Sequence, residues 1–347
     1  MTDKNKVVVG LSGGVDSASS LIFLLNRNME VFPVTLIFCD DQKSQKAVRD
    51  SEKICSELNL QHHIIDARDL FETAVLNYFV NSYENGKTPS PCVKCNAFCK
   101  FVALFDFANR IGAHYVASGH YADVVICNGR YALKRPADTC KDQSYMLALL
   151  SQEQLSRLMF PLKNMTKSQT RQLAKDHNLH ISQRKESQDL CFAEDGYIDF
   201  LQRKGVVAKS GNIIDSQGRI FGTHDGLFRY TIGQRKGIGI AAPEPYYVIA
   251  KDCEHNNLVV GFKDESLVSE LFVEDFNCQL FESIDNPLSC EVKIRYRSMA
   301  QSCIARPESG GLRIILENAQ STTSPGQYAV LYQGDMLIGG GEITRTY

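Results

Sequence analysis

The chain has no long apolar run, few prolines and no excess of charge of either sign. No segment approaches the ~18 consecutive apolar residues of a membrane-spanning helix. Residues 1–6 lead directly into a strand-like VVV and not into the apolar core of a signal peptide. We therefore expect a cytoplasmic protein with no membrane partner. With 44% hydrophobic residues, 22% charged residues and only 10 prolines, the composition also excludes collagen-like and disordered chains.

The net charge of the chain neither indicates nor excludes a nucleic-acid partner. The formal net charge is −2 over 347 residues, so any RNA binding must depend on local basic patches that are balanced by acidic surface elsewhere. A chain of this length exceeds what one hydrophobic core usually organises, which indicates a multidomain globular protein.

The 12 cysteines lack the regular paired spacing of a disulfide framework. In a reducing compartment such cysteines are free thiols, metal ligands or catalytic groups. Eight of them stand in strand-like, helical or turn contexts without paired spacing, and we interpret these as structural: Cys39, Cys55, Cys127, Cys140, Cys253, Cys278, Cys290 and Cys303.

Strand-like and helix-like segments alternate through the first part of the chain. Apolar patterning predicts strands at 7–10, 31–38, 61–66 and 114–117, with helices at 15–26, 43–58, 70–83 and 97–111. This alternation predicts an α/β fold with a doubly wound parallel sheet, whose carboxyl edge is the expected place for phosphate chemistry. The dipeptide Asn128-Gly129 within 124–133 predicts a β-hairpin.

The character of the chain changes twice after this region. Residues 142–178 read as helical, with Thr166 as the expected N-cap of a helix that carries Leu173 and Ala174 on one face. After Gly205, short β-rich runs alternate with turn residues, which predicts a C-terminal antiparallel β-barrel. We therefore expect an ATP-binding catalytic domain at 1–160, a central domain containing Cys191 at 161–270 and a barrel at 271–347.

A glycine-rich loop follows the first predicted strand and opens the first predicted helix. Its sequence from residue 10 is GLSGGVDS, which is neither a Walker A loop nor a G-x-G-x-x-G dinucleotide loop. An ordinary strand-to-helix turn is the alternative reading. Two serines, an aspartate and the placement at a helix N-terminus favour an anion site that binds a nucleotide. The segment SGGVDS at 12–17 matches the pyrophosphate-loop signature of ATP pyrophosphatases.

Three further cysteines, Cys92, Cys95 and Cys191, are candidates for thiol chemistry. Cys92 and Cys95 form a C-x-x-C pair in a loop with two prolines, immediately before a predicted helix whose N-terminus is expected to lower a thiol pKa. Cys191 ends a polar stretch far along the chain, and by itself is more typical of a small buried apolar residue.

Eight separated motifs together make the chain similar to one family over nearly its whole length. They occur in the order found in the tRNA-specific 2-thiouridylases of the bacterial MnmA type, which the chain resembles. The motifs are SGGVDS (12–17), TPSPCVKCN (88–96), SGHYA (118–122), KDQSY (141–145), KESQDLCF (185–192), YTIGQRKG (230–237), RYR (295–297) and SPGQ (324–327).

The resemblance implies an adenine nucleotide alpha-hydrolase-like fold and a tRNA-binding role for the central domain. It implies Cys95 as the nucleophile and Cys191 as the carrier of a persulfide, with Ser90, Pro91 and Cys92 facing the target base. Contacts to tRNA fall on His120, Lys141, Asp142, Gln143, Arg295, Tyr296 and Gln327. Contacts to ATP fall on Gly10, Leu11, Ser12, Gly13, Gly14, Val15, Asp16, Ser17, Leu36 and Gly119.

The implied reaction is ATP-dependent thiolation of the wobble uridine. The oxygen at ring position 2 is a poor leaving group, so ATP first adenylates it and a sulfur nucleophile then displaces AMP. A thiolate at Cys95 attacks the persulfide on Cys191, which releases sulfide or leaves a disulfide. We expect Mg²⁺ with ATP, tRNA as substrate, and a persulfide donor protein such as a cysteine desulfurase or relay protein as partner.

Cys92 departs from the family pattern, in which an aspartate is often found. Cys92 could replace this carboxylate as a proton acceptor, or it could simply pack in the loop. Alternatively, Cys92, Cys95 and Cys191 could hold an iron-sulfur cluster with one open iron. Zinc is disfavoured because no fourth ligand stands beside the trio. Cys99 lies among Phe98, Phe101 and Val102, which favours core packing.

Two other functions remain open at this point. One is a different adenylating enzyme on the same fold, which needs no paired thiols. The other is a thiol or iron-sulfur binding module that only recognises tRNA and needs no phosphate loop.

Overall fold

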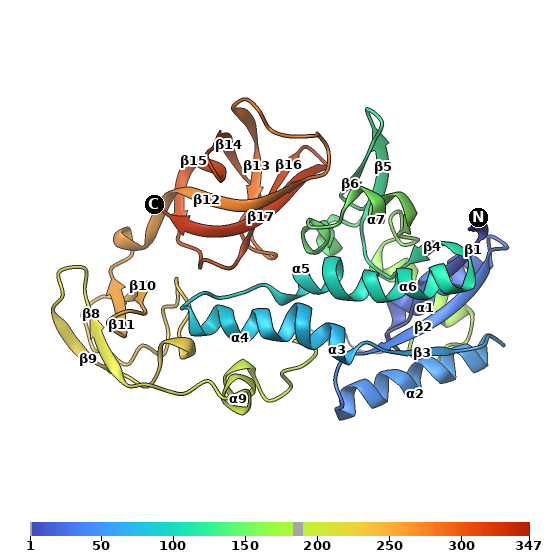
Figure 1. Cartoon of the computed structure of the whole chain (residues 1–347), viewed down its shortest axis with the longest axis horizontal. Helices are drawn as coiled ribbons and strands as arrows, with labels where there is room; N and C mark the ends of the chain where they lie inside the picture. Colours follow the sequence, from blue (N-terminus) through green and yellow to red (C-terminus); the bar gives the residue numbers. More distant parts are fainter. Residues whose placement is uncertain (1, 183–189) are drawn as a thin grey trace.

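A five-stranded parallel sheet organises the N-terminal part of the computed structural model, which describes residues 2–182 and 190–347 (Figure 1). Val7, Val8 and Val9 at its centre are fully buried, as expected for a strand covered by helices on both faces. The strand order β3-β2-β1-β4-β7 matches the predicted doubly wound α/β fold. The strands are β1 (Asp3–Gly10), β2 (Glu30–Ile37), β3 (His63–Asp66), β4 (Ala113–Ala117) and β7 (Leu158–Met159).

Two long helical arms extend from the sheet towards the central domain (Figure 1). The first arm consists of α3 (Arg68–Phe71), the π-helix η1 (Glu72–Leu76) and α4 (Asn77–Glu84). The second consists of α5 (Pro91–Cys95), the π-helix η2 (Asn96–Lys100) and α6 (Phe101–Ile111). The second arm begins before the predicted 97–111 helix, because Pro91 occupies the first helical turn, where its missing N–H costs nothing.

Most of the remaining elements of the N-terminal region had a sequence signal, and strand β7 had none. The hairpin β5 (Asp123–Cys127) and β6 (Arg130–Lys134) turns at Asn128 and Gly129, both with positive φ, as predicted. Thr166 caps α8 (Lys167–Asp176) through a capping box with Gln169, also as predicted. The strand β7 was missed, since two residues carry no periodicity. The other elements are α1 (Val15–Leu25), α2 (Gln42–Glu57), η3 (Thr139–Lys141), η4 (Ser144–Leu147) and α7 (Gln152–Arg157).

Helix α8 packs on the parallel sheet region. Its Ala174, with Leu179 and Ile181 beyond its end, belongs to the same core cluster as Val7 and Leu21. This packing brings α8 against α1 and so against the glycine-rich loop.

A small mixed sheet follows α9 (Tyr197–Arg203), and a barrel ends the chain (Figure 1). The small sheet has the order β10-β11-β8-β9, and six antiparallel strands, β12 to β17, close into the predicted barrel through the pairing of β12 with β17. Strand β6 joins the barrel sheet at Met336. The elements are β8 (Gly211–Ile214), β9 (Ile220–His224), η5 (Leu227–Arg229), β10 (Tyr247–Asp252), β11 (Asn257–Gly261), η6 (Asp264–Ser266), β12 (Leu267–Cys278), β13 (Leu288–Lys293), β14 (Gln301–Glu308), β15 (Gly311–Ser321), β16 (Tyr328–Gln333) and β17 (Met336–Thr346). Within the described part of the chain, every helix is too short or too polar to cross a bilayer.

Candidate active site

The strand order reverses between β1 and β4, and the sequence motifs meet at this point. Ligands of doubly wound sheets bind beyond the carboxyl ends of the strands where the order reverses. The glycine-rich loop leaves β1 at Gly10, and the segment Ser118 to His120 leaves β4. Leu36 lies one residue before the end of β2, beside β1 in the sheet. The fold therefore places the predicted nucleotide residues along one edge.

The glycine-rich loop is held by its own hydroxyls and by close packing. Ser17 Oγ accepts a hydrogen bond from the Ser12 backbone N–H at 3.1 Å and donates one to the Gly14 carbonyl at 3.0 Å. Gly13 has a φ of +68°, and a Cβ there would lie 2.9 Å from the Asp50 Cβ, so only glycine fits. Gly14 is the N-cap of α1, and its lack of a capping side chain leaves the first-turn N–H groups to a ligand.

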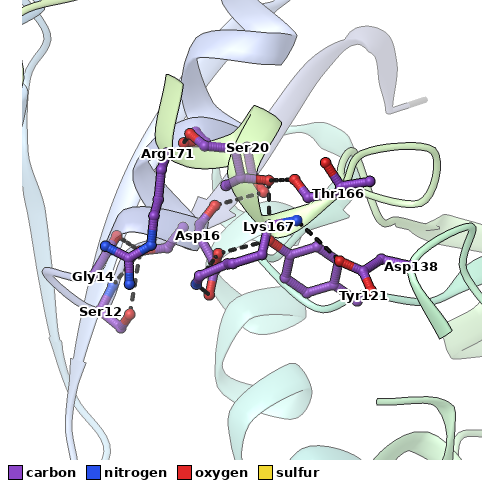
Figure 2. Close-up of polar contacts among 12 residues, drawn as sticks. Ser12, Gly14, Asp16, Ser20, Tyr121, Asp138, Thr166, Lys167 and Arg171 are labelled. Carbon is purple, nitrogen blue, oxygen red and sulfur yellow. Dashed lines mark hydrogen bonds and ion pairs between the residues drawn. The ribbon is translucent and has the colours of Figure 1, made fainter. Parts of the chain in front are cut away.

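Asp16 is the acidic group of this loop and is bound by two residues from elsewhere in the chain (Figure 2). Lys167 Nζ lies 2.7 and 2.8 Å from the two Asp16 carboxylate oxygens. The Tyr121 hydroxyl lies 3.0 Å from Asp16 Oδ1. Sequence reasoning assigned no role to Lys167, which no motif marks, or to Tyr121, although Tyr121 lies in the SGHYA motif.

The three cysteines that motivated the thiol hypothesis converge at the second helical arm. Cys92 and Cys95 lie in α5, and Cys191 is close enough for its thiol to interact electrostatically with both. Phe192 anchors this arrangement, since its ring packs on Phe79 at 5.0 Å between ring centroids. Cys95 and Phe192 share one hydrophobic cluster. Residues 183–189, which include most of the KESQDLCF motif, lie outside the described residues.

The expectation of a lowered thiol pKa is wrong for Cys92 and Cys95, and the pKa of Cys191 is raised as well. Although Cys92 and Cys191 are exposed, the protein packed around them desolvates their thiols and raises the pKa of both, that of Cys191 to about 12. A hydrogen bond with Cys99, followed by burial, raises the pKa of Cys95 well above its usual range. Desolvation, together with the Cys99 hydrogen bond at Cys95, therefore outweighs the dipole of the short helix, and the thiols are protonated at neutral pH.

Two residues of this thiol site were missed by sequence reasoning. Cys39, interpreted as structural, lies just beyond β2 and interacts with the thiols of Cys95 and Cys191. Lys100 donates a hydrogen bond to Asn96 Oδ1 at 2.9 Å, and its positive charge favours the thiolate form of the nearby cysteines. Cys39 could have been found from the sequence, because it directly follows a predicted parallel strand, at the carboxyl edge where active sites of such sheets lie. Lys100 carried no such signal, because a π-helix changes the usual helical spacing.

An iron-sulfur cluster at the three cysteines would require their thiols to be grouped as metal ligands. Across residues 2–182 and 190–347, no three His, Cys, Asp or Glu side chains are grouped so that they could hold a metal ion. Cys99 is fully buried, in agreement with the predicted core packing.

The loop before α5 is fastened to the barrel. Gln327 Nε2 donates to the Thr88 carbonyl at 2.7 Å, and the Thr88 N–H donates to the Pro325 carbonyl at 2.9 Å. Ser90 is the N-cap of α5 and Pro91 follows it. Gln327, expected at the tRNA, therefore also fixes the loop that leads to Cys92.

The other residues expected at the tRNA lie between β4, η4 and the barrel. His120 lies 2.8 Å from Ser118 Oγ through Nδ1, and burial lowers its pKa well below the usual range. Gln143 accepts from the Tyr121 N–H at 2.9 Å. Asp142 accepts from the Ser144 hydroxyl at 2.6 Å.

Lys141 ends η3, beside this group. In the barrel, Arg295 donates to the Thr322 carbonyl, and the Tyr296 ring lies 6.1 Å from that of Tyr145. The structure thus brings the residues after β4 and the end of β13 near one another through Tyr145.

Three family models match successive parts of the chain. A tRNA methyl transferase HUP domain matches residues 5–195, a tRNA methyl transferase PRC-barrel domain matches 198–262, and an aminomethyltransferase beta-barrel domain matches 268–343. The HUP domain implies that the protein uses ATP.

Full-length relatives have one activity in common. The tRNA-specific 2-thiouridylase MnmA of Pelotomaculum thermopropionicum is 38% identical over 360 residues, covering 99% of this chain and 98% of that protein. The enzyme of the same name from Nostoc sp. is 41% identical over 347 residues, covering 98% and 99%. That of Picosynechococcus sp. is 42% identical over 345 residues, covering 97% and 98%. The chain therefore belongs to the MnmA family of tRNA-specific 2-thiouridylases and is a sulfurtransferase that acts on tRNA.

Proposed function

We propose that the enzyme adenylates the 2-carbonyl of the wobble uridine at the loop 10–17 and delivers sulfur through Cys191 and Cys95. The observation that carries this proposal is the meeting of two thiols, 96 positions apart in the chain, beside the carboxyl edge where the phosphate loop begins. A different adenylating enzyme needs no such meeting.

The first half-reaction uses the anion site at the start of α1. The N–H groups of the loop and the hydroxyls of Ser12 and Ser17 bind the phosphates of ATP. The uridine oxygen attacks the α-phosphorus, pyrophosphate leaves, and the base carries AMP on its former carbonyl oxygen. Asp16 is the loop's carboxylate and would hold Mg²⁺, which neutralises phosphate charge when it is bound.

The second half-reaction exchanges oxygen for sulfur. A donor protein, such as a cysteine desulfurase or relay protein, loads Cys191 as a persulfide. The Cys95 thiolate attacks the inner sulfur, which forms a Cys95–Cys191 disulfide and releases sulfide, and the sulfide displaces AMP from the uridine carbon. A dithiol reductant then returns both cysteines to thiols. Lys100 supports this step because its charge favours the attacking thiolate.

We propose that this chemistry needs no iron-sulfur cluster. The grouping of the three cysteines does not support a metal site, and the Cys95 thiol is engaged with Cys99. In this scheme Cys92 contributes to binding the base and ligates no metal. Ser90 and Pro91 hold the helical turn of Cys92 against the target nucleotide. The tRNA is contacted by the residues that follow β4 and by Arg295, Tyr296 and Gln327.

The test separates adenylation from sulfur transfer. Cys95→Ser and Cys191→Ser should each abolish 2-thiouridine, measured by mass spectrometry of digested tRNA, and should retain tRNA-dependent pyrophosphate release. Cys253→Ser is the matched control, because Cys253 is an exposed thiol in the small sheet domain. Full turnover by Cys191→Ser would contradict the proposal and favour another adenylating enzyme.

A second measurement addresses the cluster. Protein purified without oxygen should be colourless and free of iron and should be fully active with a persulfide donor. Activity that appears only after iron and sulfide are restored would overturn the cluster-free scheme.

A further inference from the structure

The first turn of α1 contains an electrostatic conflict that the nucleotide site must resolve. Its N–H groups and the helix dipole attract phosphate, but the Asp16 carboxylate lies in the same turn and repels it. Lys167 is the cation placed against this carboxylate, and its side chain is only 13% exposed. Partial burial strengthens its influence on any anion that enters the loop.

Three sets of contacts fix the position of Lys167. It is the first residue of α8, directly after the Thr166 capping box. One turn later, the buried Thr170 lies 3.0 Å from the Tyr121 hydroxyl, and its carbonyl accepts a hydrogen bond from Ser19 at 2.9 Å. These hydrogen bonds hold α8 against α1, so that the N-terminal turn of α8 faces the phosphate loop.

A second basic residue of α8 is directed at the same loop. Arg171, one turn after Lys167, points towards Ser12 and Gly14 in Figure 2. It also donates to the Ser182 carbonyl at 3.2 Å. Two cations on one face of α8 therefore border the anion site.

We propose that Lys167 is a phosphate-binding residue whose ammonium moves from Asp16 to the phosphate oxygens of ATP, with Arg171 completing the subsite. This inference rests on the proposed use of the loop for ATP. It predicts that Lys167 discriminates between nucleotides by their phosphates: ATP and inorganic pyrophosphate need the ammonium, whereas AMP needs it much less.

A double-mutant cycle separates this role from a purely structural ion pair. Lys167→Met should weaken ATP and pyrophosphate binding about 10- to 100-fold, the effect of one charge-assisted contact. AMP affinity should change far less, and Lys167→Arg should restore most of the ATP affinity. If Lys167 served only to neutralise Asp16, the double variant with Asp16→Asn would recover wild-type affinity. We expect it to stay weak.

The titrations use calorimetry in EDTA, so that no metal bound at Asp16 contributes. Lys163→Met is the matched control, because Lys163 also pairs with an aspartate, lying 2.8 Å from Asp123, and Asp123 is outside the loop 10–17. Equal weakening of ATP and AMP, or full recovery in the double variant, would overturn the inference. Failure of the wild-type enzyme to bind ATP would instead refute the proposed use of the loop.

A separate observation in the barrel concerns two cysteines that sequence reasoning left as structural. Cys290 in β13 and Cys303 in β14 are directly opposite each other in the antiparallel register. Their sulfur atoms lie 3.6 Å apart. Directly opposed side chains in such a pair have Cβ atoms ~4.5–5.5 Å apart, close to what a disulfide requires. The separation of 13 residues in sequence gives no sign of this pairing.

We infer that Cys290 and Cys303 form a reversible disulfide when a peroxide is the oxidant. The Cys290 thiolate attacks one peroxide oxygen to give a sulfenic acid and releases water. Cys303 then attacks the sulfenic sulfur and releases a second water, so two thiols lose two electrons to the peroxide. The hydrogen bond between the two thiols lowers the pKa of Cys290, which makes it the attacking member.

Peptide mapping of the peroxide-treated enzyme tests this pair. Trypsin places Cys290 in the peptide 264–293, together with Cys278, and Cys303 in the peptide 298–313. We expect a crosslink between these peptides that dithiothreitol removes and that persists in Cys278→Ala but is lost in Cys290→Ala. Complete alkylation of both Cys290 and Cys303 after peroxide treatment, with oxidation confined to other cysteines, would overturn the inference.

Discussion

Replacing Gly119 with alanine should damage the nucleotide site through the backbone of α1. A Cβ on Gly119 would lie 2.7 Å from the Asp16 carbonyl carbon, 2.7 Å from the Ser17 nitrogen and 3.0 Å from the Asp16 oxygen. All three are backbone atoms and cannot rotate away as a flexible side chain would. The first turn of α1, which carries the N–H groups of the anion site, would therefore have to shift.

The expected magnitude follows from this contact. Overpacking of a well-packed site costs about 1–3 kcal/mol. At about 2–4 °C per kcal/mol for a unit of this size, the melting temperature should fall by about 2–12 °C. Loss of one well-aligned charge-assisted hydrogen bond to phosphate should weaken ATP binding about 10- to 100-fold. ATP should consequently raise the melting temperature of the variant less than that of the wild type.

Gly222→Ala provides the matched control. Among the described residues, no atom lies within 4 Å of a Cβ at Gly222, and neither Gly119 nor Gly222 has positive φ. The two substitutions therefore differ in the space available to the added methyl group. ATP affinity is measured by calorimetry and stability by thermal unfolding. Wild-type ATP affinity in Gly119→Ala, together with a melting temperature equal to that of Gly222→Ala, would refute the reasoning.

Three further outcomes are expected. Phe192→Ala should lower the free energy of unfolding by about 3–5 kcal/mol. It should also slow the formation of the Cys191–Cys95 disulfide, because the Phe192 ring holds the neighbouring cysteine in place, and an unchanged rate would contradict this role. Burial lowers the pKa of Lys251 from 10.5 to about 8, so the folded chain binds that proton more weakly than the unfolded chain. Lys251→Met should be more stable by at most about 3 kcal/mol below pH 8, and this advantage should vanish as the pH rises to 10.5; denaturant curves that coincide at pH 7 would exclude it. The double variant Arg295→Ala, Arg297→Ala should weaken tRNA binding more at low salt than at high salt, and an equal effect throughout a salt titration would count against phosphate contact.

Local sequence identified the elements that depend on short-range physics. The loop at 10–17 was placed correctly between the first strand and the first helix, because glycines interrupt the apolar pattern there, and Gly14 is the N-cap of α1. Asn128-Gly129 and Thr166 were also readable, since a turn dipeptide and a capping residue act within a few positions of the chain. The parallel sheet and the barrel followed from apolar periodicity.

Local sequence misjudged properties that depend on what surrounds a residue. The thiol pKa values of Cys92 and Cys95 were expected to be low because a helix was predicted to begin directly after them, but burial and neighbouring thiols raise these pKa values. The start of the second helical arm was placed too late, because a π-helix interrupts the spacing on which periodicity relies.

The kind of chemistry and the order of the domains could be read along the chain. Each of these depends on residue type and on spacing over a few positions. The meeting of Cys95 with Cys191, the ion pair of Asp16 with Lys167 and the opposition of Cys290 to Cys303 could not. These contacts are set by helix packing and strand register between distant segments, and no local preference encodes them.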